Sequence, residues 1–345
     1  MNKGFTLVEL LAVIVILAVI LVIAIPQVLK VVDNSRLNSY INQEQLLIRA
    51  AELYVSNNTG LLPTEIGDTI LIELSELQSH SLIGEITDLR NKNIECDGYV
   101  LLRKNSDISY DYVPYIKCAD NYVSTTIITD GLILDMPLGN HTDGNIYLDR
   151  SDFNNHGTNY GSTLAQNRFG EENNSTFFSG GNNYILIDES DSFLGSKDNG
   201  QISYTWWMKP EGDGSDNEIF RLYINSNNRM RFRRFSSTNF RVGVVANGSS
   251  NFRNIESDIE VQNWQFFVYL IDGSEHLIYK NGEFKGSVNL GNDRSLNLIQ
   301  GNPKIYIGRP SGSFFGTLDE IRVYGRRLSE DEIKHIYNVT KYKLN

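Results

Sequence analysis

The sequence is poor in cysteine and histidine, and it has fewer basic than acidic side chains. Its two cysteines, Cys96 and Cys118, exclude a zinc-finger module or a disulfide-dense scaffold in a chain of 345 residues. The histidines show no HExxH or similar metal-binding spacing, and there is no P-loop motif for phosphate. With 31 basic and 42 acidic side chains the net charge is -11, which argues against general binding of nucleic acids.

Apolar residues are abundant, at 41%, and aromatic residues make up 11% of the sequence. These fractions are enough to form packed cores, and they exclude a wholly disordered chain. At roughly 150 residues per domain, the length predicts two globular units and a smaller element.

Residues 5–25 form an apolar run in which only Thr6 and Glu9 are polar. As a helix rising about 1.5 Å per residue, the run spans about 31 Å, the thickness of a membrane's hydrocarbon core. The short segment before it and the lack of a convincing cleavage site after it argue against a secretory signal peptide. A plain membrane anchor does not explain Glu9, because an ionisable group there costs about 3 kcal/mol and usually has a partner. No Lys or Arg lies within the run, so we expect that partner on another chain.

The segment GFTLVEL, Gly4–Leu10, resembles the class III leader of type IV prepilins and pseudopilins. Pro26 also matches the position of a helix kink in that family. The resemblance implies that prepilin peptidase cleaves after Gly4 and methylates the amine of Phe5. It implies that Glu9 pairs with the Phe5 amine of a neighbouring pilin subunit during filament assembly. The precursor, with leader 1–4 and apolar segment 5–26, is then expected in the cytoplasmic membrane, and the mature chain in an extracellular filament on a bacterial cell.

Residues 27–125 are predicted to form a pilin head. Apolar residues recur at three- and four-residue spacing from Leu37 to Val55, and an Asn-Asn-Thr-Gly cluster at 57–60 ends this helical pattern. Two short strands are expected at 99–102 and 110–115. Cys96 and Cys118 flank them, and in an exported domain they are expected to form a disulfide that contributes about 3 kcal/mol. The expected fold is an α+β pilin, a long N-terminal helix with a small antiparallel sheet.

Helical periodicity ends near residue 130. From 131 to 345, short apolar runs alternate with clusters of Gly, Asn, Ser and Asp, which predicts an antiparallel all-β sandwich. Asn281-Gly282 predicts a tight turn, and the capping box Ser329–Glu332 predicts a helix that ends near Asn338.

Several of these segments resemble the laminin G-like family of concanavalin A-like jelly rolls. The matches extend over nearly all of residues 131–340, and the strongest is FGTLDEIRVY at 315–324 followed by LSEDEI at 328–333. The resemblance allows for a calcium site at the rim of the sandwich, with Asp149 and Asp319 as the candidate ligands, because calcium prefers oxygen ligands. The alternative is that both carboxylates cap turns and neutralise nearby arginines.

Residues 229–235, RMRFRRF, form a basic stretch within an acidic chain. As a strand, the stretch places Arg229, Arg231 and Arg233 on one face and Met230 and Phe232 on the other. Arginine forks suit an acidic glycan or another polyanion, and no specific nucleic acid is expected. The alternative is a solvated sheet face whose charges are balanced by neighbouring Asp and Glu side chains.

Glu256, Asp258 and Glu260 occupy alternate positions, and on a strand they share one face. This spacing is close to the catalytic signature of concanavalin A-like β-glucanases, in which one carboxylate is the nucleophile and another the acid/base. Ser257 stands where an aliphatic residue is usual. An exposed acidic edge that discourages sheet pairing is the alternative.

The sequence as a whole predicts a filament subunit without catalytic activity of its own. The laminin G-like domain, 131–345, is larger than the head, so a filament of this subunit alone would be crowded. We therefore expect a minor subunit that acts in adhesion, through binding of a glycan or of a host or cell-surface protein. A pseudopilin of a secretion system and a filament-tethered glycan hydrolase are the alternatives.

Overall fold

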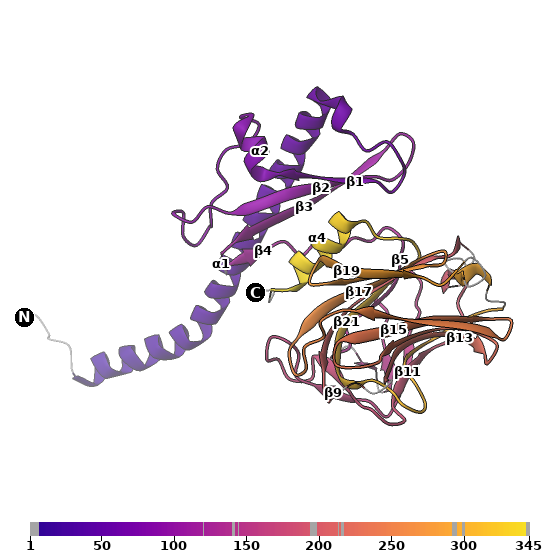
Figure 1. Ribbon diagram of the computed structural model, residues 1–345. Coiled ribbons are helices and arrows are strands. Elements are labelled where there is room, and N and C mark those ends of the chain that lie inside the picture. The colour runs from indigo at the N-terminus through magenta and orange to yellow at the C-terminus, as the bar shows by residue number, and fades with distance from the viewer. Residues whose placement is uncertain are drawn as a thin grey trace, which may run out of the picture. The chain divides into compact units, whose positions relative to one another are not determined.

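The computed structural model describes residues 7–119, 121–139, 142–143, 145–193, 199–212, 214, 217–291, 295–298 and 301–342. The chain divides into two compact units, residues 1–126 with 344–345, and residues 127–343. Each unit has its own hydrophobic core. Figure 1 shows the long helix and small sheet of the first unit and the two sheets of the second.

The first unit is built on α1, Leu7–Asn57, a helix of 51 residues. Its first half is predominantly apolar and exposes most of its large side chains, from Leu7 to Val32. Among the described residues, α1 is long and apolar enough to cross a membrane. The helix continues through Pro26, and Figure 1 shows α1 as one curved helix. It ends at Asn57, before the 3-10 helix η1, Thr59–Leu61, as the Asn-Gly cluster predicted.

The second half of α1 packs on a small antiparallel sheet of order β1-β2-β3-β4. Buried side chains of α1, such as Leu47 and Ala51, share a core with Val100 and Ile116 of the sheet. The disulfide predicted between the two cysteines is present. The long helix and the small sheet confirm the α+β pilin architecture. The elements are β1 (Thr69–Glu73), α2 (Leu74–Ser79), β2 (Asp97–Lys104), β3 (Tyr110–Cys118) and β4 (Tyr122–Val123).

The second unit is a sandwich of two antiparallel sheets, as predicted. In the described residues one sheet has eight strands, in the order β19-β18-β17-β12-β21-β10-β9, with β5 also paired to β21. These strands are β5 (Leu132–Met136), β9 (Thr163–Ala165), β10 (Ser175–Ser179), β12 (Gln201–Pro210), β17 (Gln265–Asp272), β18 (Glu275–Lys280), β19 (Glu283–Asn289) and β21 (Phe315–Tyr324).

The other sheet has nine strands among the described residues, in the order β16-β15-β14-β13-β20-β11-β8-β7-β6. They are β6 (Thr142–Asp143), β7 (Ile146–Tyr147), β8 (Gly157–Tyr160), β11 (Tyr184–Ile187), β13 (Asn217–Asn225), β14 (Asn228–Arg234), β15 (Asn239–Ala246), β16 (Ser249–Glu256) and β20 (Lys304–Gly308). The 3-10 helix η3, Leu296–Leu298, precedes β20.

The inner faces of the two sheets form one aromatic core. Trp206 of β12 lies 5.0 Å from the ring of Phe220 on β13 and 5.3 Å from that of Phe232 on β14. All three side chains are fully buried. Because strand side chains alternate between faces, this core determines which residues of the nine-stranded sheet face outward.

Local sequence signals explain the turn and the last helix of this unit. Asn281 and Gly282, between β18 and β19, both have positive φ, 53° and 84°, as a tight Asn-Gly turn requires. Helix α4, Glu330–Thr340, opens with the predicted capping box, in which Ser329 and Glu332 satisfy each other's backbone amides. It continues slightly beyond the predicted end.

Candidate functional site

The structure places the three predicted arginines on one face of β14. Met230 and Phe232 are fully buried in the core. Arg229, Arg231 and Arg233 alternate with them along the strand and therefore lie on the outer face of the nine-stranded sheet. The predicted separation of charged and apolar faces is thus present.

Strand register brings further arginines to this outer face. Arg221 on β13 is the direct partner of Arg231, and Arg241 on β15 is the direct partner of Arg233. We call the five residues Arg221, Arg229, Arg231, Arg233 and Arg241 the arginine face. The two added by register lie outside the basic stretch of the sequence.

One buried carboxylate serves part of this face. Glu218, which is fully buried, accepts hydrogen bonds from Arg221 and, at 2.6 Å, from Nε of Arg231. Arg309, in the loop after β20, lies 3.5 Å from the same carboxylate. Arg221 and Arg231 thus share one negative charge, and among the contacts of the described residues this carboxylate balances their two positive charges only in part.

Arg229 differs from the other members of the arginine face. Among the described residues it has no hydrogen-bond or ion-pair partner. Burial lowers the pKa of Arg229, and the positive charges of Arg231 and Arg221 lower it further. The group still remains charged at neutral pH, because a guanidinium does not lose its proton in proteins. Arg229 is thus a cation whose surroundings favour an added anion.

Aromatic rings support the other end of the arginine face. The guanidinium of Arg233 lies 5.0 Å from the ring centre of Phe252, and that of Arg241 lies 3.7 Å from the ring centre of Phe235. Such contacts hold a guanidinium in place by cation–π attraction. Gly243 leaves room for the Phe252 ring, because a Cβ at this position would lie 2.0 Å from it.

A row of tyrosines continues this face across the sheet. Tyr160 on β8 stacks on Tyr184 of β11 at 4.7 Å, and Tyr184 lies 5.6 Å from Tyr306 of β20. Tyr306 in turn meets Tyr223 of β13 edge-on at 5.9 Å. We call these four residues the tyrosine row. Tyr223 is the direct strand partner of Arg229, so the row ends at the arginine face.

The tyrosine row was not predicted from the sequence. The sequence does hold a local signal for two of its members. Tyr184 begins an aliphatic run, and Tyr306 stands between two isoleucines, as a residue on the outer face of an amphipathic strand does. The proximity of the rings depends on the pairing of β8, β11, β20 and β13, which are distant in sequence.

Asp149, one of the two predicted calcium ligands, is fully occupied by hydrogen bonds from the protein. Its carboxylate accepts from the backbone amides of Asp135, Ser151 and Asn155 at 2.8–2.9 Å and from the Ser151 hydroxyl at 2.6 Å. These bonds organise the turn before β8. The arrangement corresponds to turn capping, the alternative that the sequence left open.

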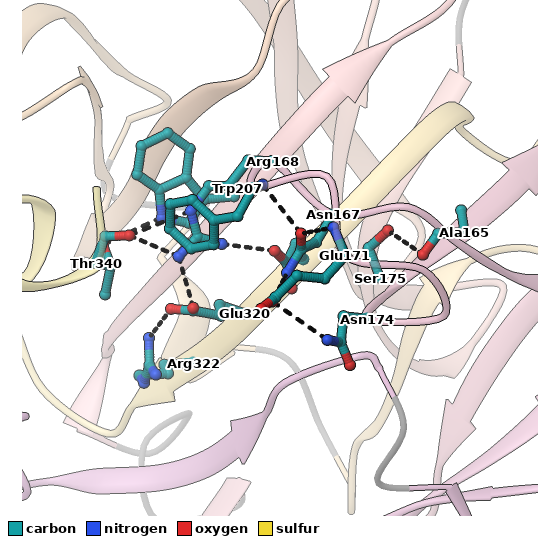
Figure 2. A network of polar contacts seen from close by, with 12 residues as sticks. Ala165, Asn167, Arg168, Glu171, Asn174, Ser175, Trp207, Glu320, Arg322 and Thr340 are labelled. Carbon is teal, nitrogen blue, oxygen red and sulfur yellow. Dashed lines mark hydrogen bonds and ion pairs between the residues drawn. The ribbon is translucent and has the colours of Figure 1, made fainter. Parts of the chain in front are cut away.

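Asp319, the other predicted ligand, belongs to a buried ion-pair network around Arg168. Figure 2 shows Arg168 with Glu320 and Arg322 of this network. Arg168 Nη1 donates to Asp319 at 2.5 Å, and Nη2 donates to Glu320 at 2.6 Å. Arg322 forms an ion pair with each of two carboxylates, 3.2 Å from its Nη1 to Glu320 and 2.9 Å from its Nε to Asp135. Burial raises the pKa of Asp319, and the Arg168 charge opposes this shift.

The two carboxylates as arranged do not fit a calcium site. Their oxygen atoms are directed at protein donors, and no group of three or more acidic, histidine or cysteine side chains that could hold a metal ion occurs in the described residues. Calcium binding stays a prediction from the family resemblance.

The acidic triplet does not lie on one strand, so the shared face considered for Glu256, Asp258 and Glu260 is not formed. Strand β16 ends at Glu256, because its partner β15 begins at the paired residue Asn239. Asp258 has a positive φ of 45°, which is incompatible with a continuing strand. Glu260 pairs with Lys280 at 2.8 Å, and hydrogen bonding to that lysine lowers the pKa of Glu260. A carboxyl with a lowered pKa is poorly suited to act as a general acid near neutral pH.

The predicted processing residues Gly4 and Phe5 lie outside the described residues. Glu9 and Pro26 lie within α1. Their roles in cleavage and filament assembly stay predictions.

Two family models match the chain. One, described as the prokaryotic N-terminal methylation motif, matches residues 1–25. The other, described as the concanavalin A-like lectin/glucanases superfamily, matches residues 179–334. The chain carries a type IV pilin leader and a concanavalin A-like domain. Such a leader and the apolar helix behind it fit a membrane-anchored precursor that is assembled with other pilins into an extracellular filament after processing by prepilin peptidase.

Solved structures similar to the chain include domain 4 of an extracellular arabinanase from Geobacillus stearothermophilus, in complex with arabinotriose. It is 17% identical, with a TM-score of 0.49, and the match covers 61% of this chain and 100% of that domain. The receptor-binding domain of a botulinum neurotoxin C/D mosaic serotype is 17% identical, with a TM-score of 0.49, and the match covers 62% of this chain and 52% of the neurotoxin domain. This chain thus spans about half of the neurotoxin domains it matches. No curated protein matches the sequence.

Proposed function

We propose that this protein is a minor subunit of a type IV pilin-like filament and that its concanavalin A-like domain acts as an adhesin for acidic glycans. The leader and α1 supply membrane anchoring and filament assembly, and the sandwich supplies the binding surface. The proposal assigns binding rather than turnover to the sandwich, since the acidic triplet lacks the strand geometry of a glycan hydrolase.

The observation that carries the proposal is the arginine face. Arg229 has no ion-pair partner among the described residues, and two positively charged neighbours, Arg221 and Arg231, share one buried carboxylate. A carboxylate or sulfate of a glycan placed at Arg229 supplies the missing negative charge. Charge-assisted hydrogen bonds of this type are stronger than neutral ones and fix the orientation of the ligand.

Arg229→Gln tests the glycan-binding part. This variant removes the charge from a side chain that has no hydrogen-bond or ion-pair partner among the described residues, so the fold should be unaffected. We expect binding of the full-length chain in detergent to immobilised acidic oligosaccharides to weaken about tenfold, the effect of losing one charged hydrogen bond. Unchanged affinity would remove the arginine face from the proposed function.

Arg253→Gln is the matched control. Arg253 is an exposed arginine on β16 of the same sheet, and its strand partner Val242 faces the core, so Arg253 lies on the opposite face from Arg229. The two variants change the net charge equally. A general electrostatic effect would weaken binding in both, whereas a site at the arginine face weakens it only in Arg229→Gln.

The position of the subunit is tested on filaments. A minor subunit should appear as sparse immunogold label, concentrated at one place such as a tip. Dense label along whole filaments would contradict this part of the proposal.

A pseudopilin of a secretion system is the second candidate, because the leader and the apolar helix are common to both classes. A pseudopilin stays in a short filament within the cell envelope. Protease added to intact cells should therefore cleave the sandwich of an adhesin and spare that of a pseudopilin.

A further inference from the structure

The tyrosine row has hydroxyl groups that the protein itself does not use. None of the hydroxyls of Tyr160, Tyr184, Tyr223 and Tyr306 makes a hydrogen bond within the described residues, whereas the hydroxyls of Tyr147 and Tyr279 do. None of the four is among the buried oxygen atoms without a partner, so solvent reaches them. Four accessible hydroxyls thus lie in a row that ends at Arg229, which also has no hydrogen-bond or ion-pair partner in the part of the chain that the structure describes.

The ring geometry shows which part of each tyrosine is presented. Tyr160 and Tyr184 are stacked, with 13° between their planes, so they cover each other's faces and offer their edges and hydroxyls. The outer face of Tyr160 has no further aromatic neighbour among the described residues, and this residue is 44% exposed. The row therefore offers a line of hydroxyl groups, with one open ring face at the end far from Arg229.

The charges are confined to one end of this line. The arginine face lies on β13, β14 and β15, whereas the rest of the row crosses β20, β11 and β8. Lys304 on β20 is paired with Asp188 at 3.1 Å. The ligand that fits is neutral and polar over most of its length and anionic at one end.

We propose that the tyrosine row and Arg229 together bind an oligosaccharide that ends in a single acidic sugar. The acid group lies at Arg229, sugar hydroxyls exchange hydrogen bonds with the phenol groups, and the ring furthest from the acid stacks on Tyr160. Five strands about 4.8 Å apart span about 19 Å, which suits an oligosaccharide of about three or four rings. Phenols suit such a ligand because each has an apolar ring and a hydroxyl that both donates and accepts. This inference rests on the proposed function and adds the ligand's chemical class and orientation.

A polyanion fits this surface less well. A fully acidic polysaccharide or a single-stranded nucleic acid carries a charge at every unit, and among the described residues the cations along the row gather at the end near Arg229. The net charge of -11 also repels such chains as they approach.

The test measures binding of the full-length chain in detergent to oligosaccharides of increasing length in three forms: neutral, with one terminal uronic or sialic acid, and acidic at every ring. An oligothymidylate serves as a nucleic-acid probe. We expect the singly acidic form to bind tightest, with an affinity that rises with length and levels off at about four rings, the span of the row.

The sharpest variant is Tyr184→Phe combined with Tyr306→Phe. It keeps the rings and their packing and removes two hydroxyls that make no hydrogen bond within the described ranges. We expect about tenfold weaker binding of the longer ligands and little change for a single acidic sugar. Tyr279→Phe, which removes a hydroxyl from the other sheet, is the control and should bind as the parent chain does.

The outcomes separate this inference from the proposed function. If acidic ligands bind through Arg229 but affinity is independent of length or of the two hydroxyls, the inference fails and the proposed function stands. Tightest binding of the fully acidic form or of the oligothymidylate also overturns the inference. If no acidic saccharide binds, both fail.

Discussion

Replacement of Arg168 by methionine should destabilise the second unit more than any other single change at the buried network in Figure 2. The side chain of Arg168 is 5% exposed and lies in the loop between β9 and β10. It donates to Asp319 and Glu320, and to the carbonyl of Thr340 at 2.6 and 3.1 Å, and its guanidinium lies 4.7 Å from the ring of Trp207. Methionine fills similar space but leaves these acceptors without a cation.

The magnitude follows from burial. Asp319 would be left without its cation, with a side chain only 3% exposed. Removing one partner of a buried ion pair costs about 3–5 kcal/mol. Burial already raises the pKa of Asp319, and loss of Arg168 raises it further. A carboxyl whose folded pKa is raised contributes stability at pH values below that pKa and loses it as pH rises, so the deficit of the variant should be smaller at pH 5 than at pH 8.

Tryptophan fluorescence during urea unfolding measures this deficit. All three tryptophans, Trp206, Trp207 and Trp264, lie in the second unit, so the signal reports that unit alone. The double variant Arg168→Met with Asp319→Asn also removes the carboxyl that has lost its cation, and it should recover at least half of the lost free energy of unfolding. A loss below about 1 kcal/mol, or an equal loss at both pH values, would refute the reasoning from burial.

Three further predictions concern stability. Burial lowers the pKa of His276 to about 3, so the neutral ring stabilises the fold above its unfolded pKa, and this contribution is lost as pH falls. The free energy of unfolding should therefore be about 3 kcal/mol lower at pH 4.5 than at pH 8, and His276→Gln should reduce this dependence on pH. Replacing both Cys96 and Cys118 by serine should destabilise the head by about 3 kcal/mol, seen as faster proteolysis there with unchanged tryptophan-monitored unfolding. Calcium or a chelator should shift the Tm of the second unit by less than about 1 °C, because Asp149 and Asp319 are occupied; a rise of several degrees with calcium would restore the predicted site.

Sequence by itself determined the features that depend on neighbours along the chain. The end of α1, the Asn-Gly turn at 281–282 and the capping box of α4 follow from residues within four positions of one another. Alternation in β14 likewise placed Arg229 and Met230 on opposite faces before any strand pairing was known. The disulfide could also be predicted without knowing the register of the strands, because the sequence has only two cysteines.

Tertiary structure alone decided which of these residues meet. The tyrosine row joins the arginine face through the pairing of β20 with β11 and β13, strands that lie far apart in sequence, whereas Arg221 meets Arg231 across the neighbouring strands β13 and β14. A shift of register by one residue would turn these side chains inward. The partners of Asp319 are equally distant, with Arg168 more than a hundred residues away. Local patterns fix the face on which a side chain lies, but the neighbours on that face, and hence the charge that a ligand encounters, depend on the order and register of the strands.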